Sequence, residues 1–196
     1  MQRIHRTDED GLAFRDSSTR RSALAELGAL FALLHTSPAL AQPASAAAEE
    51  AKAPPLPAIG STMTVPAIDL LQGAGRFDPA AAQGKPLLIY WWSSTCPFCG
   101  LQSPSMEKLW QSQKGGHWQM LALSIDRKTE DAETYLRARG YSFPAAWASP
   151  AWRTRFPKPK GLPITLVIGR DGKVLLAEKG QMFDEDVQAM AGLLTT

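Results

Sequence analysis

The chain has 196 residues with 21 basic and 19 acidic side chains, so its formal net charge at neutral pH is only +2. A charge this small argues against nucleic acid as a partner, because domains that bind nucleic acid carry a concentrated basic surface. The chain has only two cysteines, so a structural zinc site, which needs four ligands, is not expected.

Residues 1–41 have the features of an export signal peptide. A polar stretch containing Arg20 and Arg21 leads into an apolar run over 24–34, and the segment ends in Ala-Leu-Ala, a small-x-small cleavage pattern. The paired arginines resemble a twin-arginine signal, but Ala23 stands where an aromatic residue is usual, which leaves twin-arginine and general secretion both open. The apolar run is shorter than the roughly 20 residues that span a bilayer. We therefore expect cleavage, with an uncleaved membrane anchor as the alternative.

Export would place the mature protein in the periplasm, where disulfides form and persist. Removing residues 1–41 takes away five basic and five acidic side chains, so the net charge stays at +2. It also leaves His117 as the single histidine, which excludes a histidine-rich metal site. We expect no metal and no cofactor in the mature protein.

The segment 42–58 is rich in alanine and proline. Few of its side chains could enter a core, so we interpret it as a semi-rigid spacer. Residues 59–196 then form one domain, because this length suits a single compact core.

The strongest strand signal covers residues 87–92, Leu-Leu-Ile-Tyr-Trp-Trp. Its apolar run is continuous rather than alternating, which is typical of a central strand that is buried on both faces. A helix-like stretch from Pro97 to Gln113 follows, with the proline in the first turn, where a missing N–H costs nothing. Cys96 and Cys99 lie where the strand turns into the helix.

A Cys-x-x-Cys pair at such a turn predicts a redox site. Free backbone N–H groups at the start of the helix stabilise a thiolate on Cys96, while Cys99, one turn along, can close a disulfide with it. We expect Cys96 to be the exposed nucleophile and Cys99 the buried resolving thiol. The alternative, a purely structural disulfide, would stabilise the fold little because its loop is so short.

The remaining elements alternate between strands and helices, after short strand pieces within 60–84. The first is a strand over 118–125, and the next is a helix that Thr129 caps and Gly140 ends. A loop over 141–160 follows, and then strands 164–168 and 173–176, which the Asp171-Gly172 turn joins. The last element is a helix that Asp184 caps. We interpret the basic residues of the loop as a solvated surface, with a docking surface for an acidic partner as the alternative. This order predicts an α/β fold in which a central mixed β-sheet is flanked by helices.

Three stretches, 92–99, 161–173 and 84–87, resemble the TlpA/ResA-like branch of the thioredoxin fold. The resemblance covers about residues 59 to 194. It implies an exported thiol–disulfide oxidoreductase that exchanges disulfides with client proteins, in cytochrome c maturation or copper-site assembly. We expect a monomer that a membrane redox partner resets.

The resemblance also implies roles for residues outside the cysteine pair. Pro163 would be the cis-proline that faces the cysteines, and the backbone of Leu162 would pair with an extended client segment. We expect Pro97, Phe98 and Trp92 to contact the client as well.

The motif departs from the family pattern in ways that bear on mechanism. Thr95 precedes the first cysteine where tryptophan is usual, and Pro97 comes first in the inner dipeptide, as in oxidising sites. The direction of electron flow, reductase or oxidase, is therefore open. Tyr90 stands six residues before Cys96, where thioredoxin-like sites commonly place a buried acid. Without a base, Cys99 should resolve mixed disulfides slowly at neutral pH. The alternative is that Tyr90 only packs in the sheet and a distant acid or a water relay takes the proton.

Two other functions could use the same cysteines. A Cu(I) chaperone could bind the metal through two thiolates, although related copper chaperones have a wider cysteine spacing and a histidine. A peroxiredoxin-type peroxidase would need proline seven and threonine or serine three residues before the attacking cysteine. Ile89 and Ser93 occupy these positions, so the proline is missing and we favour the oxidoreductase.

Overall fold

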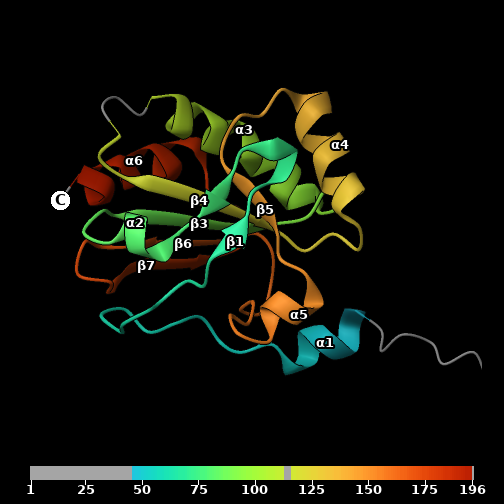
Figure 1. Ribbon diagram of the computed structural model, residues 1–196, viewed down its shortest axis with the longest axis horizontal. Coiled ribbons are helices and arrows are strands. Elements are labelled where there is room, and N and C mark those ends of the chain that lie inside the picture. The colour runs from blue at the N-terminus through green and yellow to red at the C-terminus, as the bar shows by residue number, and fades with distance from the viewer. Residues whose placement is uncertain (1–45, 113–115, 196) are drawn as a thin grey trace, which may run out of the picture. The chain divides into compact units, whose positions relative to one another are not determined.

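The computed structural model describes residues 46–112 and 116–195 (Figure 1). The described residues all belong to one compact unit. The predicted signal peptide, residues 1–41, lies outside the described residues. In the part of the chain that the structure describes, no helix has the length and apolar character needed to cross a membrane.

A mixed five-stranded sheet with the order β5-β4-β3-β6-β7 is the centre of the fold. β3 lies in the middle, parallel to β4 and antiparallel to β6, while β4 pairs in parallel with β5 and β6 antiparallel with β7. The strands are β3 Leu87–Trp92, β4 Gln119–Ser124, β5 Ala145–Trp147, β6 Ile164–Ile168 and β7 Val174–Lys179. The expectation of an α/β fold with a central mixed sheet is confirmed.

Helices cover both faces of this sheet (Figure 1). Side chains from α3, α4 and α6 pack on one face, and α5 contributes to the core on the other. The remaining elements are α1 Ala46–Lys52, β1 Ile68–Asp69, a 3-10 helix Leu71–Gly73, β2 Arg76–Phe77, α2 Pro79–Ala82, α3 Pro97–Gln111, α4 Thr129–Arg139, α5 Pro150–Arg153 and α6 Asp184–Thr195.

The central strand is buried along its whole length, as its unbroken apolar run predicts. Because successive side chains of a strand point to opposite faces, Leu88, Tyr90 and Trp92 pack in the core beneath α3, α4 and α6. The alternate residues of β3 pack in the second core, with Trp152 of α5 among their neighbours. The sheet therefore holds the end of β3, which leads into the cysteines, between two apolar layers.

Two predicted helix caps are wrong. Lys128, not Thr129, is the residue that precedes α4, and it makes no side-chain cap. Asp184 lies inside the first turn of α6, where its carboxylate accepts a hydrogen bond from the Lys108 ammonium at 3.2 Å. Both helices have acidic residues in the first turn, where the positive end of the helix dipole favours them. Gly140 ends α4 in the left-handed conformation, as predicted, with φ of 67°.

The spacer interpretation of 42–58 is also wrong for its described part. Residues 46–52 form α1, and the Glu50 side chain contacts Lys158 and Gly161, so the segment is attached to the domain. The predicted loop over 141–160 contains β5 and α5, and its Lys158 is buried rather than solvated. Both errors have one cause, since the contacts that order these segments come from residues distant in sequence.

Candidate active site

The two cysteines flank the first turn of α3. Cys96 is the N-cap of the helix, with an extended backbone, and Pro97 occupies the first helical position. The Cys96 sulfur is partly exposed and accepts a hydrogen bond from the backbone N–H of Cys99 at 3.2 Å. Such an N–H, at the positive end of the helix dipole, stabilises a thiolate. The geometry therefore favours Cys96 as the attacking sulfur.

Cys99 has the opposite environment, because its side chain has no exposed surface. Burial away from water, and then the neighbouring Cys96 sulfur, raise the pKa of the Cys99 thiol well above its ordinary value, and a hydrogen bond from the Ser93 backbone opposes this shift only in part. Cys99 is therefore a protonated thiol at neutral pH. Both cysteines are free thiols in this structure.

Tyr90 lies under the first turn of α3. Its hydroxyl donates to the Cys99 carbonyl at 3.1 Å and lies 3.1 Å from the Ser103 hydroxyl, which itself donates to the same carbonyl. Burial raises the pKa of the Tyr90 phenol well above its ordinary value. The group in the position of the usual buried acid thus stays protonated and acts as a hydrogen-bond donor, so it cannot take the Cys99 proton at neutral pH.

A buried carboxylate organises residues 93–95, which we call the cysteine turn. Asp126 lies two residues after the end of β4 and is 7% exposed. One carboxylate oxygen accepts from the Ser93 hydroxyl at 2.7 Å and from the hydroxyl and backbone N–H of Ser94 at 2.9 and 3.0 Å, and the other accepts from the Ser124 hydroxyl at 2.8 Å. The Ser93 carbonyl in turn accepts the backbone N–H of Cys96. Asp126 therefore holds the turn that places the first cysteine.

A second buried side chain connects α3 to the opposite side of the site. The Gln102 amide donates to the Thr165 hydroxyl of β6 at 2.9 Å and accepts the backbone N–H of Met182 at 2.8 Å. The next residue, Phe183, is 70% exposed. Phe98 and Leu101, one turn apart on α3, are also largely exposed, at 56% and 62%. The hydrogen bond from Met182 to Gln102 thus attaches the segment that carries Phe183 to α3. The same helix carries Phe98 and Leu101.

The Leu162–Pro163 peptide bond is cis and immediately precedes β6. The Pro163 carbonyl accepts the backbone N–H of Gly180 at 2.9 Å, which ties this end of β6 to β7. Leu162 is partly buried and, like Cys96, packs against the core that lies under α3.

Trp92 requires a correction, because it has no exposed surface. It packs against Tyr135 of α4, with ring centroids 5.3 Å apart, and cannot touch a client in this conformation. Its place on β3 explains the error, since the side chain points into the core rather than toward the cysteine turn.

His117 lies away from the cysteines. Gln119 at the start of β4 pairs with Leu87 at the start of the parallel β3, whereas the cysteines follow the end of β3. The histidine therefore lies at the opposite end of the sheet. Among the described residues no cluster of three or more histidine, cysteine, aspartate or glutamate side chains could hold a metal ion.

Sequence reasoning missed Asp126 and Gln102 as parts of this site. A signal for Asp126 existed, because polar residues that follow neighbouring parallel strands meet at one edge of a sheet, and Asp126 follows β4 as Ser93 follows β3. Gln102 gave no signal, since a glutamine within a helix is ordinarily exposed.

The chain resembles several known proteins. The model of the AhpC/TSA family matches residues 62–177. A stretch of 39 residues is 44% identical to the soluble secreted antigen MPT53 of Mycobacterium tuberculosis, and it covers 20% of this chain and 22% of that protein. Thiol-disulfide oxidoreductase ResA of Halalkalibacterium halodurans is 23% identical over 112 residues, which are 57% of this chain and 64% of ResA. The matched region therefore spans less than two thirds of either relative.

The fold resembles that of solved thiol–disulfide exchange proteins. The thiol:disulfide interchange protein DsbE from Chlorobium tepidum superimposes with a TM-score of 0.56 and 26% identity, covering 69% of this chain and 94% of that one.

Proposed function

Because the chain belongs to the AhpC/TSA family, and to its ResA-like branch with the thioredoxin fold, we propose that it is an extracytoplasmic protein thiol–disulfide oxidoreductase. One observation carries the proposal. A partly exposed sulfur at the start of a helix lies one turn before a buried thiol with a raised pKa, an arrangement that suits one attacking and one resolving cysteine.

In the reducing direction the Cys96 thiolate attacks one sulfur of a client disulfide. The client S–S bond breaks, one client cysteine leaves as a thiolate, and a mixed disulfide joins Cys96 to the client. Cys99 then loses its proton to solvent and attacks the Cys96 sulfur. The second client thiolate leaves, so two electrons have reduced the client disulfide and a Cys96–Cys99 disulfide has formed. Oxidation of a client dithiol is the same sequence in reverse.

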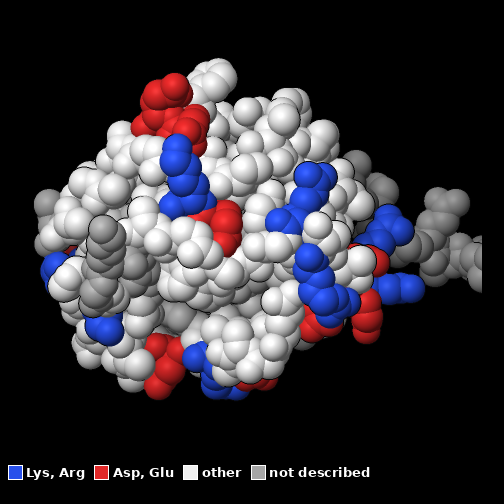
Figure 2. All heavy atoms as spheres, turned by 90° about the horizontal axis from the view of Figure 1, so that it is seen from above, with Lys and Arg blue, Asp and Glu red and all other residues white. Residues whose placement is uncertain are grey.

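Exposed apolar side chains on α3 and just before α6 support contact with a client polypeptide. Phe98 and Leu101 of α3, together with Phe183 before α6, are exposed large apolar residues, and such residues ordinarily mark interaction surfaces when they gather. Figure 2 shows the α3 and α6 side of the molecule, on which acidic and basic side chains are interspersed with no large patch of one sign. We propose that Pro97, Phe98 and Pro163 line the contact and that the Leu162 backbone pairs with an extended client segment.

The compartment and partners follow from the same role. The name of the MPT53 relative describes a secreted protein, and the features of residues 1–41 support export, so we place this protein in the periplasm. A monomer that a membrane redox partner resets would complete the cycle. Clients in cytochrome c maturation or copper-site assembly fit the resemblance to the ResA-like branch.

Trapping experiments test the assignment of the two cysteines. Cys99→Ala should accumulate mixed disulfides with client proteins, because nothing resolves the first bond, whereas Cys96→Ala should form none. Non-reducing electrophoresis after acid quenching and alkylation would reveal them, and the wild-type protein should reduce insulin catalytically. If Cys99 in the Cys96→Ala variant reacts with iodoacetamide faster than Cys96 in the Cys99→Ala variant, the roles are reversed.

A further inference from the structure

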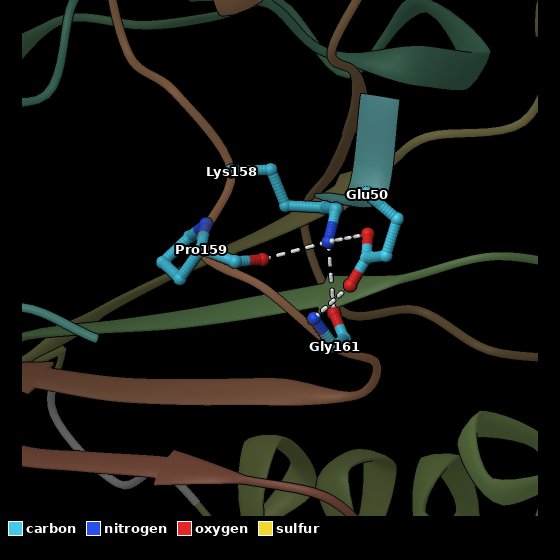
Figure 3. A network of polar contacts seen from close by, with 4 residues as sticks. All are labelled: Glu50, Lys158, Pro159 and Gly161. Carbon is cyan, nitrogen blue, oxygen red and sulfur yellow. Dashed lines mark hydrogen bonds and ion pairs between the residues drawn. The ribbon is translucent and has the colours of Figure 1, made fainter. Parts of the chain in front are cut away.

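Lys158 is a lysine whose charge is buried, with a side chain only 7% exposed. Its ammonium donates to the Glu50 carboxylate at 3.0 Å, to the Pro159 carbonyl at 2.7 Å and to the Gly161 carbonyl at 2.9 Å (Figure 3). These three acceptors match the three donors of an ammonium group. A buried charge is costly unless it is paired and hydrogen-bonded, so this lysine depends on all three partners.

Glu50 holds the same short stretch of backbone from the other side. While one of its oxygens faces the Lys158 ammonium, the other accepts the backbone N–H of Gly161 (Figure 3). The N–H of Lys160 donates to the Pro54 carbonyl at 2.9 Å. The ammonium groups of Lys158 and Lys160 lower the pKa of the Glu50 carboxyl, which partial burial alone would raise. The backbone of residues 159–161 is thus fixed at four polar groups, three of them bound by Glu50 or Lys158.

Any other residue at position 161 would be strained in this conformation. The φ of Gly161 is 102°, and a Cβ placed there would lie 2.8 Å from the Lys179 side chain. The stretch that these contacts fix continues directly into Leu162 and Pro163, which the proposed function assigns to client binding. We call residues 159–163 the client loop.

We propose that Glu50 and Lys158 are positioning residues for the client loop. The segment just after the predicted export signal, which carries Glu50, would then contribute to client binding. This inference rests on the proposed function. Neither side chain touches the reacting sulfurs. Their loss should weaken the binding of a protein client while leaving exchange with a small disulfide unchanged, because a small disulfide needs Cys96 but not the loop.

The test compares Glu50→Gln, Lys158→Met and the double variant with the wild-type protein. Reduction of insulin would be followed over a range of insulin concentrations, and reaction with the small disulfide DTNB would be followed under the same conditions. We expect KM for insulin to rise about fivefold in each single variant, with kcat and the DTNB rate within about twofold of wild type. The KM of the double variant should rise by less than the product of the two single effects, because both single variants already lose the shared Glu50–Lys158 contact. Lys52→Met, an exposed lysine of α1, is the matched control and should behave as wild type.

Amide hydrogen exchange gives a readout that does not depend on activity. The Gly161 N–H should exchange faster in Glu50→Gln than in wild type, while amides of β3 should not change, which also shows that the variant is folded. An unchanged KM together with an unchanged Gly161 exchange rate would overturn the inference. Equal losses toward insulin and DTNB in a folded variant would overturn it as well. If wild-type protein fails to reduce insulin, the proposed function fails instead, and the exchange measurement still decides whether Glu50 fixes the loop.

Discussion

Two turns, the cysteine turn and the client loop, are each fixed by one buried charge of opposite sign. At the cysteine turn the Asp126 carboxylate accepts hydrogen bonds from hydroxyl groups and from a backbone N–H. At the client loop the Lys158 ammonium donates hydrogen bonds to two backbone carbonyls and to the Glu50 carboxylate. The first charge comes from the end of the neighbouring strand, while the counter-ion of the second comes from α1, 108 residues away. Disturbing the first should therefore alter cysteine chemistry, and disturbing the second should alter client binding.

The largest effect is expected from Asp126→Ala. The substitution leaves the Ser93, Ser94 and Ser124 donors without their acceptor, and each buried unsatisfied group costs about 1–3 kcal/mol. We expect the free energy of unfolding to fall by about 3 kcal/mol, and the DTNB rate to fall because Cys96 loses its fixed turn. Urea denaturation and stopped-flow kinetics measure the two effects. Glu178 is an exposed acid on β7, so Glu178→Ala is the control and should change neither the stability nor the DTNB rate. A normal DTNB rate in Asp126→Ala would show that the cysteine turn places Cys96 without the Asp126 carboxylate.

The second expectation concerns the pH dependence of resolution at the cysteine turn. Since burial raises the pKa of Cys99 well above neutrality, its thiolate fraction, and with it the resolution rate, should rise about tenfold per pH unit between pH 7 and 9. Stopped-flow decay of a mixed disulfide with a fluorescent peptide would show this slope.

The same slope distinguishes the two turns. Glu50→Gln should keep it, because the client loop acts on binding and not on the Cys99 proton. A resolution rate that does not change with pH in wild type would mean that a base takes the proton from Cys99.

A third and smaller effect concerns Phe98, an exposed residue in the first turn of α3. Removing its exposed ring by Phe98→Ala should raise KM for insulin about threefold, with an unchanged rate toward DTNB, because apolar contact area contributes to client binding alone. Ile59→Ala removes a similarly exposed apolar side chain from another part of the chain and should leave both values unchanged. A fall in the DTNB rate would place Phe98 in the chemistry and not in client contact.

The smallest effect is a pH dependence of stability at the client loop. The pKa of Glu50 is lowered in the folded protein, so its contribution is fully present above the unfolded-state pKa and is lost as pH falls through the lower folded value. Because the Glu50 side chain is 37% exposed, we expect the ion pair to contribute at most about 1 kcal/mol to the free energy of unfolding. The stability difference between wild type and Glu50→Gln, measured in urea, should shrink from pH 6 to pH 3. A difference that stays constant would show that the ion pair adds nothing to stability.

The sequence predicts those parts of the fold that depend on local pattern. The apolar run of β3, the cysteine turn, the helix that follows it and the hairpin around Asp171-Gly172 all carry short-range signals, and the structure contains each of them. β5, with three residues, has no pattern of its own and forms by pairing with β4. The Glu50–Lys158 contact joins residues that each look exposed in the sequence, so only the folded chain shows that they meet. Trp92 shows the converse error, in which a residue near the motif in sequence faces away from it.

The position of β3 in the sheet also has a consequence for how the chain is made. Its antiparallel partner is β6, which begins at Ile164, so one hydrogen-bonding edge of the most apolar strand stays uncovered until that residue has been synthesised. At about 5–20 residues per second this interval lasts several seconds. During it the residues of the cysteine turn and Asp126, which holds that turn, are synthesised well before residues 159–163 of the client loop. The contacts that place the first cysteine can therefore form before the loop that we propose to bind clients is complete.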